Sequence, residues 1–171
     1  MTRRLFPLLS VALLFVAGPL VPVASAQSDG PRMPAAEAAV RATLDALFDG
    51  MRAGDSTAVR DVFHDDARLH TAGGPSDTAG VSETPVDAFV AAVGQPRERV
   101  WDERTWDVAV RVDGPLASAW VPYVFYRGDE RSHCGVNAVQ LVRGPDGWRI
   151  LQLTDTRRQA CDVPPEVQKS R

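Results

Sequence analysis

The chain of 171 residues has little cysteine, no long basic run in its body and none of the short motifs that mark common chemistries. Two Cys, 13 Gly and 13 Pro exclude a disulfide-dense miniprotein and a collagen-like repeat. With 19 Lys+Arg against 22 Asp+Glu, no nucleic-acid-binding surface is expected. Zinc-finger spacing, H-E-x-x-H, a phosphate loop, a dinucleotide glycine fingerprint and a G-x-S-x-G elbow are absent from the sequence. The sequence therefore predicts neither a metal site nor a bound cofactor.

The N-terminal segment has the pattern of a secretory signal. Arg3 and Arg4 give it a positive start, residues 5 to 23 are mostly apolar, and residues 24 to 26 read Ala-Ser-Ala. Prolines and a glycine interrupt the apolar stretch, which leaves it shorter than the roughly 20 residues that a membrane span needs. We therefore predict a signal peptide over residues 1 to 26, export to the periplasm or out of the cell, and no stable membrane anchor once the signal is removed.

The rest of the chain is long enough for one hydrophobic core. Residues 27 to 34 are polar and contain prolines, which predicts a flexible leader. Residues 162 to 171 carry two prolines and few apolar side chains, which predicts a loose C-terminal tail. A single domain is expected between them, over residues 35 to 161.

Apolar residues recur at helical spacing in the first half of this domain. The spacing predicts a first helix over residues 35 to 53. Asp55 is expected to cap a shorter second helix. Thr84 as a cap, with Pro85 at the first helical position, predicts a third helix, which Gly94 ends.

In the second half the apolar period changes to two, which indicates strands. Turns containing Gly and Pro separate four strands, predicted over residues 106 to 112, 117 to 126, 134 to 143 and 148 to 154. One earlier strand is expected over residues 67 to 71, followed by a loop over residues 73 to 83. This order predicts an α+β domain in which three N-terminal helices pack in the concave face of a curved, mostly antiparallel sheet.

The tight turn before the last strand gives an estimate of the strand register. If Arg143 faces Trp148, then Asn137 faces Thr154. Counting back through the preceding hairpins places aromatic side chains on the same face of the sheet as these polar ones. The expected inward face carries Trp106, Tyr123, Phe125, His133, Asn137, Gln152 and Thr154.

The order of elements, together with two short stretches, resembles the nuclear transport factor 2-like superfamily. The stretches are Asp-Val-Phe-His-Asp-Asp-Ala at residues 61 to 67 and Gly-Trp-Arg-Ile at residues 147 to 150. The resemblance implies a cone whose sheet wraps the helices and leaves a pocket at its open end, often in a homodimer packed through the outer sheet face. The superfamily includes ketosteroid isomerase, scytalone dehydratase, SnoaL-like polyketide cyclases, limonene epoxide hydrolase and lumazine-binding-like proteins, so the fold does not settle the function.

The expected inward face suits a small apolar or aromatic molecule held by a few hydrogen bonds. Candidates for proton transfer are His133, His70 on the first strand, and Tyr123, which is similar to the tyrosine of the isomerase branch. That branch also needs a carboxylate inside the cone, whereas alternation turns Asp107 and Asp155 outward. A binding protein for a small molecule is therefore the first expectation, with a lyase or isomerase, or a homodimeric accessory module, as alternatives.

Cys134 and Cys161 are the only cysteines. Alternation puts Cys134 on the outer face opposite Arg157, and Cys161 lies four residues beyond that partner. A disulfide between the two would fasten the C-terminal segment of an exported protein. Two free thiols are the alternative.

Overall fold

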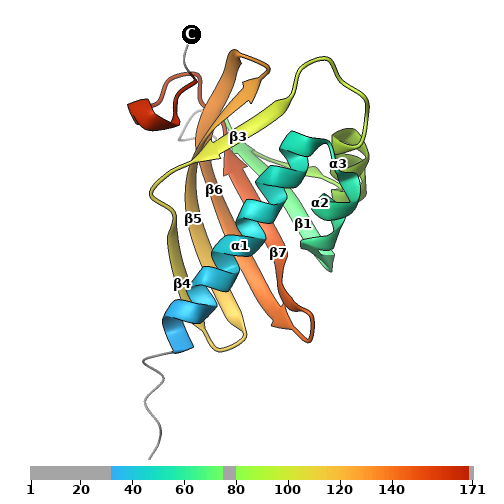
Figure 1. The fold of residues 1–171 in the computed structure, drawn as a ribbon, viewed down its shortest axis with the longest axis vertical. Coiled ribbons are helices and arrows are strands. Elements are labelled where there is room, and N and C mark those ends of the chain that lie inside the picture. The colour runs from blue at the N-terminus through green and yellow to red at the C-terminus, as the bar shows by residue number, and fades with distance from the viewer. Residues whose placement is uncertain (1–31, 75–79, 170–171) are drawn as a thin grey trace, which may run out of the picture.

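In the computed structural model, described for residues 32–74 and 80–169, three helices lie on the concave face of a curved, unclosed sheet (Figure 1). Helix α1 (Arg32–Ala53) runs diagonally across the strands, while α2 (Ser56–Asp61) and α3 (Val86–Val93) lie beside it, near the first strand (Figure 1). All three predicted helices are present. The predicted fold class, an α+β single domain with helices inside a curved sheet, is confirmed.

The ends of the helices follow from local chemistry. The Asp55 carboxylate accepts the backbone N–H groups of Thr57 and Ala58, both at 3.0 Å, and so caps α2 as predicted. The prediction for α3 is wrong by one residue, because Pro85 and not Thr84 occupies the cap position. Thr84 is instead the last residue of a strand, where it pairs with the neighbouring strand.

Within the described residues, the sheet has seven strands in the order β2-β1-β7-β6-β5-β3, and β4 also pairs with β5. All pairs are antiparallel except β1 with β7, which is parallel. The predicted loop at residues 73–83 contains β2. The predicted strand at residues 106–112 starts only at Ala109, as β4, and β3 before it was not predicted. The strands are β1 (Phe63–Gly73), β2 (Gly80–Thr84), β3 (Trp101–Thr105), β4 (Ala109–Asp113), β5 (Leu116–Arg127), β6 (Glu130–Gly144) and β7 (Gly147–Thr156).

The break between β3 and β4 contains one residue more than the facing part of β5. Thr105 pairs with Tyr123, whereas Ala109 pairs with Trp120. Pro122 lies opposite the break: its carbonyl oxygen accepts the Trp106 N–H at 3.3 Å, but it has no N–H to donate in return, so the ladder is incomplete there. Because side chains alternate along a strand, the extra residue exchanges the two faces between β3 and β4.

A second irregularity lies in β7. The predicted register holds up to Ile150, Leu151 is an extra residue, and from Gln152 onward the pairing with β6 is shifted by one. Asn137 therefore pairs with Asp155. Beyond Leu151, each side chain of β7 lies on the face opposite to the predicted one.

The C-terminal segment is packed on the outer face of the sheet, in contrast to the predicted loose tail. A single turn, η1 (Pro165–Val167), follows the last strand. The Lys169 ammonium donates to the Gly128 carbonyl oxygen at 2.7 Å. An outer cluster of apolar side chains fixes the segment to β5 and β6; it consists of Trp106, Val124, Tyr126, Cys134, Cys161, Val163 and Val167.

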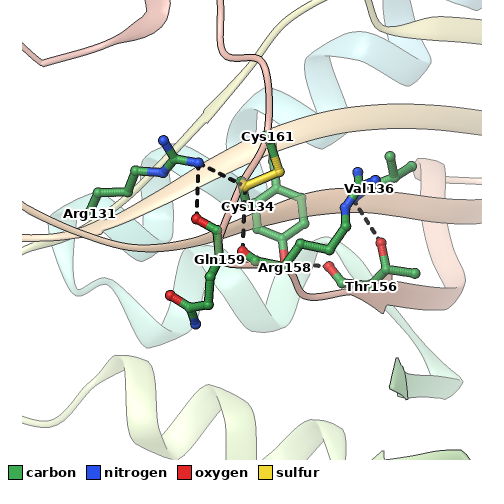
Figure 2. The surroundings of a disulfide bond; sticks show 8 residues. Arg131, Cys134, Val136, Thr156, Arg158, Gln159 and Cys161 are labelled. Carbon is green, nitrogen blue, oxygen red and sulfur yellow. Dashed lines mark hydrogen bonds between the residues drawn. A yellow bond between two sulfur atoms is a disulfide. The ribbon is translucent and has the colours of Figure 1, made fainter. Parts of the chain in front are cut away.

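A disulfide joins Cys134 to Cys161 within this outer cluster (Figure 2). The predicted bridge is therefore present, and the alternative of two free thiols is not. The backbone N–H and carbonyl of Cys134 pair with those of Arg158, at 2.9 and 2.7 Å. This partner lies one residue beyond the predicted one, Arg157.

Within the described ranges, no helix has the length and apolar content to cross a membrane. The predicted signal peptide at residues 1–26 lies outside the described residues, as do residues 27–31 of the predicted leader. The last residues of that leader belong to α1, which begins at Arg32.

Candidate functional site

A hollow with two lobes lies between the helices and the concave face of the sheet. The first, which we call the apolar lobe, has a volume of about 140 Å³. The second, the aromatic lobe, has a volume of about 170 Å³. The apolar lobe is walled by Leu47, Phe48, Phe63, Leu69 and Leu153. The aromatic lobe is walled by Trp101, Tyr123, Phe125 and His133, with Arg127 at its border.

Five residues border both lobes, so the two volumes form one site. They are Met51, Phe89, Glu103, Asp155 and Arg157. Two of these residues come from the helices and cover the hollow with apolar groups. The other three come from β3 and from the end of β7, and they place ionisable groups at the junction of the lobes.

Glu103 is held by a buried amide on β6, the strand beyond its pairing partner β5. The Asn137 side-chain N–H donates to one Glu103 carboxylate oxygen at 2.7 Å, and Asn137 is only 3% exposed. Burial raises the pKa of Glu103 to about 7, with a further increase from Asp155 and a partial offset from the Asn137 hydrogen bond and the Arg157 charge. The Glu103 carboxyl therefore exchanges its proton near neutral pH, as a general acid or base requires.

The Tyr123 hydroxyl is engaged inside the protein. It lies 3.2 Å from an Asp155 carboxylate oxygen and 3.0 Å from the Thr156 carbonyl oxygen. Burial, reinforced by Glu103 and Asp155, raises the pKa of Tyr123. Tyr123 therefore positions the end of β7 and does not present a free donor to the hollow.

Gly135 makes this close approach possible. A Cβ atom at this position would overlap the carbonyl oxygen of Thr156. Only glycine lets the backbone of Thr156 pass so near β6, where its carbonyl meets the Tyr123 hydroxyl. The close approach of Thr156 to β6 also places the next residue, Arg157, at the junction of the lobes.

Arg157 and His133 complete the polar part of the site. Arg157 Nε donates to an Asp155 carboxylate oxygen at 2.7 Å, which neutralises a carboxylate that is largely buried. The His133 ring packs on the Phe125 ring, with 5.1 Å between centroids, and meets Tyr123 edge-on at 5.7 Å. Burial lowers the pKa of His133, and the nearby Arg157 lowers it further, so the imidazole is neutral at pH 7.

The structure brings together part of the predicted site. Tyr123, Phe125 and His133 wall the aromatic lobe, and Asn137 and His70 border the apolar lobe. The site contains in addition Trp101, Glu103, Arg127, Asp155 and Arg157, which the sequence interpretation missed. No group of three or more His, Cys, Asp or Glu side chains suited to a metal ion occurs in residues 32–74 and 80–169.

Three predicted pocket residues lie outside the hollow. Trp106 packs in the outer cluster with Val124 and Tyr126, because, as the first residue of the break, it still follows the alternation of β3. Gln152 and Thr154 bond to each other at 3.2 Å, and the extra residue in β7 turns both away from the hollow.

Two carboxylates lie in the hollow that the sequence interpretation did not place there. Glu103 lies on β3, upstream of the break, and faces Phe125 across the ladder. Asp155 lies beyond the extra residue of β7, and the predicted outward orientation of its side chain is wrong. Pro122 is the one sequence signal that marks either irregularity, since proline within a strand favours a bulge.

This architecture, a curved sheet wrapped around three helices with a polar group inside the hollow, is that of the cone-shaped nuclear transport factor 2-like superfamily. The chain belongs to the family described as "Putative lumazine-binding", whose sequence pattern matches residues 35–154. No curated protein matches the chain.

Solved structures of the same superfamily are similar in fold at low sequence identity. One is a nuclear transport factor 2-like protein with a cystatin-like fold from Novosphingobium aromaticivorans, with TM-score 0.62, 15% identity and coverage of 82% of this chain and 91% of that chain. A protein of unknown function from Mycobacterium tuberculosis has TM-score 0.65, 16% identity and coverage of 85% and 87%. A "putative dehydratase" from Streptomyces avermitilis has TM-score 0.56, 18% identity and coverage of 74% and 99%.

Proposed function

We propose that the chain binds a small molecule with an apolar or aromatic body in the two-lobed hollow. The observation that carries this proposal is the combination of apolar and aromatic walls with Glu103, Asp155 and Arg157 at the junction of the lobes. Small-molecule sites typically have such a composition, in which a few polar groups orient a ligand held by apolar contacts. Membership in a family described as lumazine-binding supports the same class of function. The signal pattern of residues 1–26 and the disulfide support export as part of the proposal.

Binding is tested by the indole N–H resonances of the tryptophans in an NMR titration. Three probes that share one skeleton are used: cinnamate, which is an anion, and the neutral molecules cinnamamide and benzylideneacetone. We expect at least one of them to shift the indole signal of Trp101, which walls the aromatic lobe. Trp120 lies on the outer face and is 58% exposed, so its signal is the internal control and is expected to stay in place. If no probe shifts Trp101 at millimolar concentration, or if only Trp120 responds, the proposed site is wrong.

A second candidate function is a lyase or isomerase that acts by proton transfer, and Glu103 favours it. Its carboxyl lies in the hollow with a pKa of about 7. The ionised form can remove a proton from a carbon next to a carbonyl group, which leaves an enolate and a neutral Glu103. The proton then returns to carbon. The structural similarity to a protein described as a "putative dehydratase" supports the same class of reaction.

Exchange of the methyl protons of benzylideneacetone in D₂O tests this second function. We expect the protein to accelerate exchange, and Glu103→Gln to lose the acceleration roughly hundredfold or more, which is typical for removal of a general base. The rate is expected to rise as pH increases through about 7, because the ionised carboxylate is the active form. Glu98→Gln, at an exposed glutamate, is the matched control. Equal exchange rates for the wild-type protein and Glu103→Gln would exclude Glu103 as the base.

A further inference from the structure

Part of the Arg157 guanidinium remains available to a ligand. Its Nε donates to Asp155, and its side chain is 57% exposed. Among the residues that the structure describes, neither terminal nitrogen of Arg157 donates a hydrogen bond to the protein. A guanidinium carries five N–H donors, so the edge formed by the terminal nitrogens can still bind an oxyanion. Because Arg157 borders both lobes, that edge lies at the site itself.

The charges that face the aromatic lobe leave an excess of positive charge. Arg127, at the end of β5, and Arg157 both border it. Of the two acidic groups, Asp155 already accepts hydrogen bonds from Arg157 and Tyr123. Glu103 is about half neutral at pH 7, and His133 carries no charge there because its pKa is lowered. Two positive charges therefore face the Asp155 charge and about half a charge on Glu103, so a small net positive charge remains to attract an anionic group.

The walls of the same lobe fit a flat ring. Trp101 and Phe125 meet edge to face with 6.1 Å between centroids, and Phe125 in turn packs on His133. The Arg97 guanidinium lies 4.0 Å from the centroid of the Trp101 ring, which holds the indole in place. Three neighbouring aromatic rings offer faces and edges to a planar molecule.

We infer that the aromatic lobe binds a planar aromatic anion, with its ring among Trp101, Phe125 and His133 and its oxyanion on Arg157 and Arg127. This assignment rests on the proposed function and adds the charge and shape of the ligand. A carboxylate fits the guanidinium edge best, because two parallel N–H groups can donate to its two oxygens.

Calorimetric titration with cinnamate and cinnamamide tests the inference, because the two probes share one skeleton and differ in charge. We expect cinnamate to bind at least tenfold more tightly than cinnamamide at neutral pH. Added salt is expected to weaken cinnamate binding and to leave cinnamamide binding unchanged. Equal affinities for the two probes would overturn the anion inference while leaving the binding function in place. Failure of both probes to bind would also overturn the anion inference, and the binding function would fall with it only if benzylideneacetone did not bind either.

Two arginine variants and a control locate the anion. Arg157→Gln is expected to abolish the preference for cinnamate over cinnamamide and Arg127→Gln to reduce it severalfold. Arg111→Gln, at an exposed arginine on β4 outside both lobes, is the matched control and is expected to keep the full preference. If Arg127→Gln and Arg157→Gln both keep the full preference, the assigned anion site is wrong. Circular dichroism and the melting temperature of each variant show whether the fold is retained.

Discussion

Glu103→Gln is expected to make the protein more stable than wild type above neutral pH and to flatten the pH dependence of its stability. Burial raises the pKa of Glu103 from an ordinary value of 4.5 to about 7. Below pH 4.5 the carboxyl is protonated in both the folded and unfolded states. As pH rises from 4.5 to about 7, the unfolded chain releases this proton while the folded protein keeps it, so the free energy of unfolding falls.

The size of this effect follows from the difference between the pKa values of Glu103 in the unfolded and folded states. At 1.36 kcal/mol for each pH unit, ionising Glu103 in the folded protein costs about 3 kcal/mol relative to the unfolded chain. Glutamine cannot ionise, and its amide oxygen can still accept the hydrogen bond from Asn137. We therefore expect Glu103→Gln to exceed wild type by up to about 3 kcal/mol in free energy of unfolding at mildly alkaline pH.

Urea unfolding over a range of pH measures this difference. The difference between variant and wild type isolates Glu103, because other groups contribute equally to both curves. His133 is one such group: its lowered pKa makes stability rise with pH around its ordinary value of 6.5. Glu98→Gln removes the same charge at an exposed site and is expected to leave the curve parallel to wild type. If the Glu103→Gln and wild-type curves are parallel as well, Glu103 is not buried in an unfavourable environment.

The elements with regular periodicity could be predicted from the sequence. The buried face of α1 carries Leu44, Leu47 and Met51, at the spacing of one side of a helix. In β5, Tyr123 and Phe125 face the helices as alternation predicts. Each of these assignments depends on a repeat that continues through the element, so many positions support the same answer.

The polar half of the site could not be predicted, because one inserted residue in a strand exchanges the faces to which all later side chains point. Before the break between β3 and β4, and after Leu151 in β7, alternation gives the wrong face. The two missed carboxylates, Glu103 and Asp155, and the misplaced Trp106 all lie on the far side of such an insertion. Nothing in the sequence distinguishes Leu151 from an ordinary strand residue, whereas Pro122 does indicate a bulge.

Strand β2 and the C-terminal segment have no periodic pattern in the sequence that would predict them. All residues of β2 (Gly80–Thr84) are exposed, so the strand has no apolar alternation. The C-terminal segment is fixed by a small number of long-range contacts, among them buried Val163 and the bridge at Cys161. Its composition alone indicates disorder, and only the tertiary contacts override that indication.

Removing the disulfide with Cys134→Ala and Cys161→Ala together is expected to lower the free energy of unfolding by about 3.5 kcal/mol. The bridge joins residues 27 positions apart, and closing a loop of that length reduces the entropy of the unfolded chain by about this amount. For a chain of this size the melting temperature is expected to fall by about 10 °C. Differential scanning calorimetry without reductant measures the change.

Reduction of the wild-type protein is the matched control, since it breaks the bridge and leaves both side chains in place. A reductant is expected to lower the wild-type melting temperature nearly as far as the double substitution does. The double variant is expected to be insensitive to the same reductant. Equal melting temperatures for oxidised and reduced wild type, or two reactive thiols in denatured, unreduced protein, would contradict the assigned bridge.

The effect on ligand binding is expected to be much smaller than the effect on stability. The strand end beside the site keeps both backbone hydrogen bonds between Cys134 and Arg158, and the Tyr123 hydroxyl still meets the Thr156 carbonyl. Below its melting temperature the double variant should therefore show the same probe-induced shift of the Trp101 indole signal as wild type. If the shift is lost while the protein is still folded, the bridge positions the site directly, and the backbone ladder alone does not hold Arg157 in place.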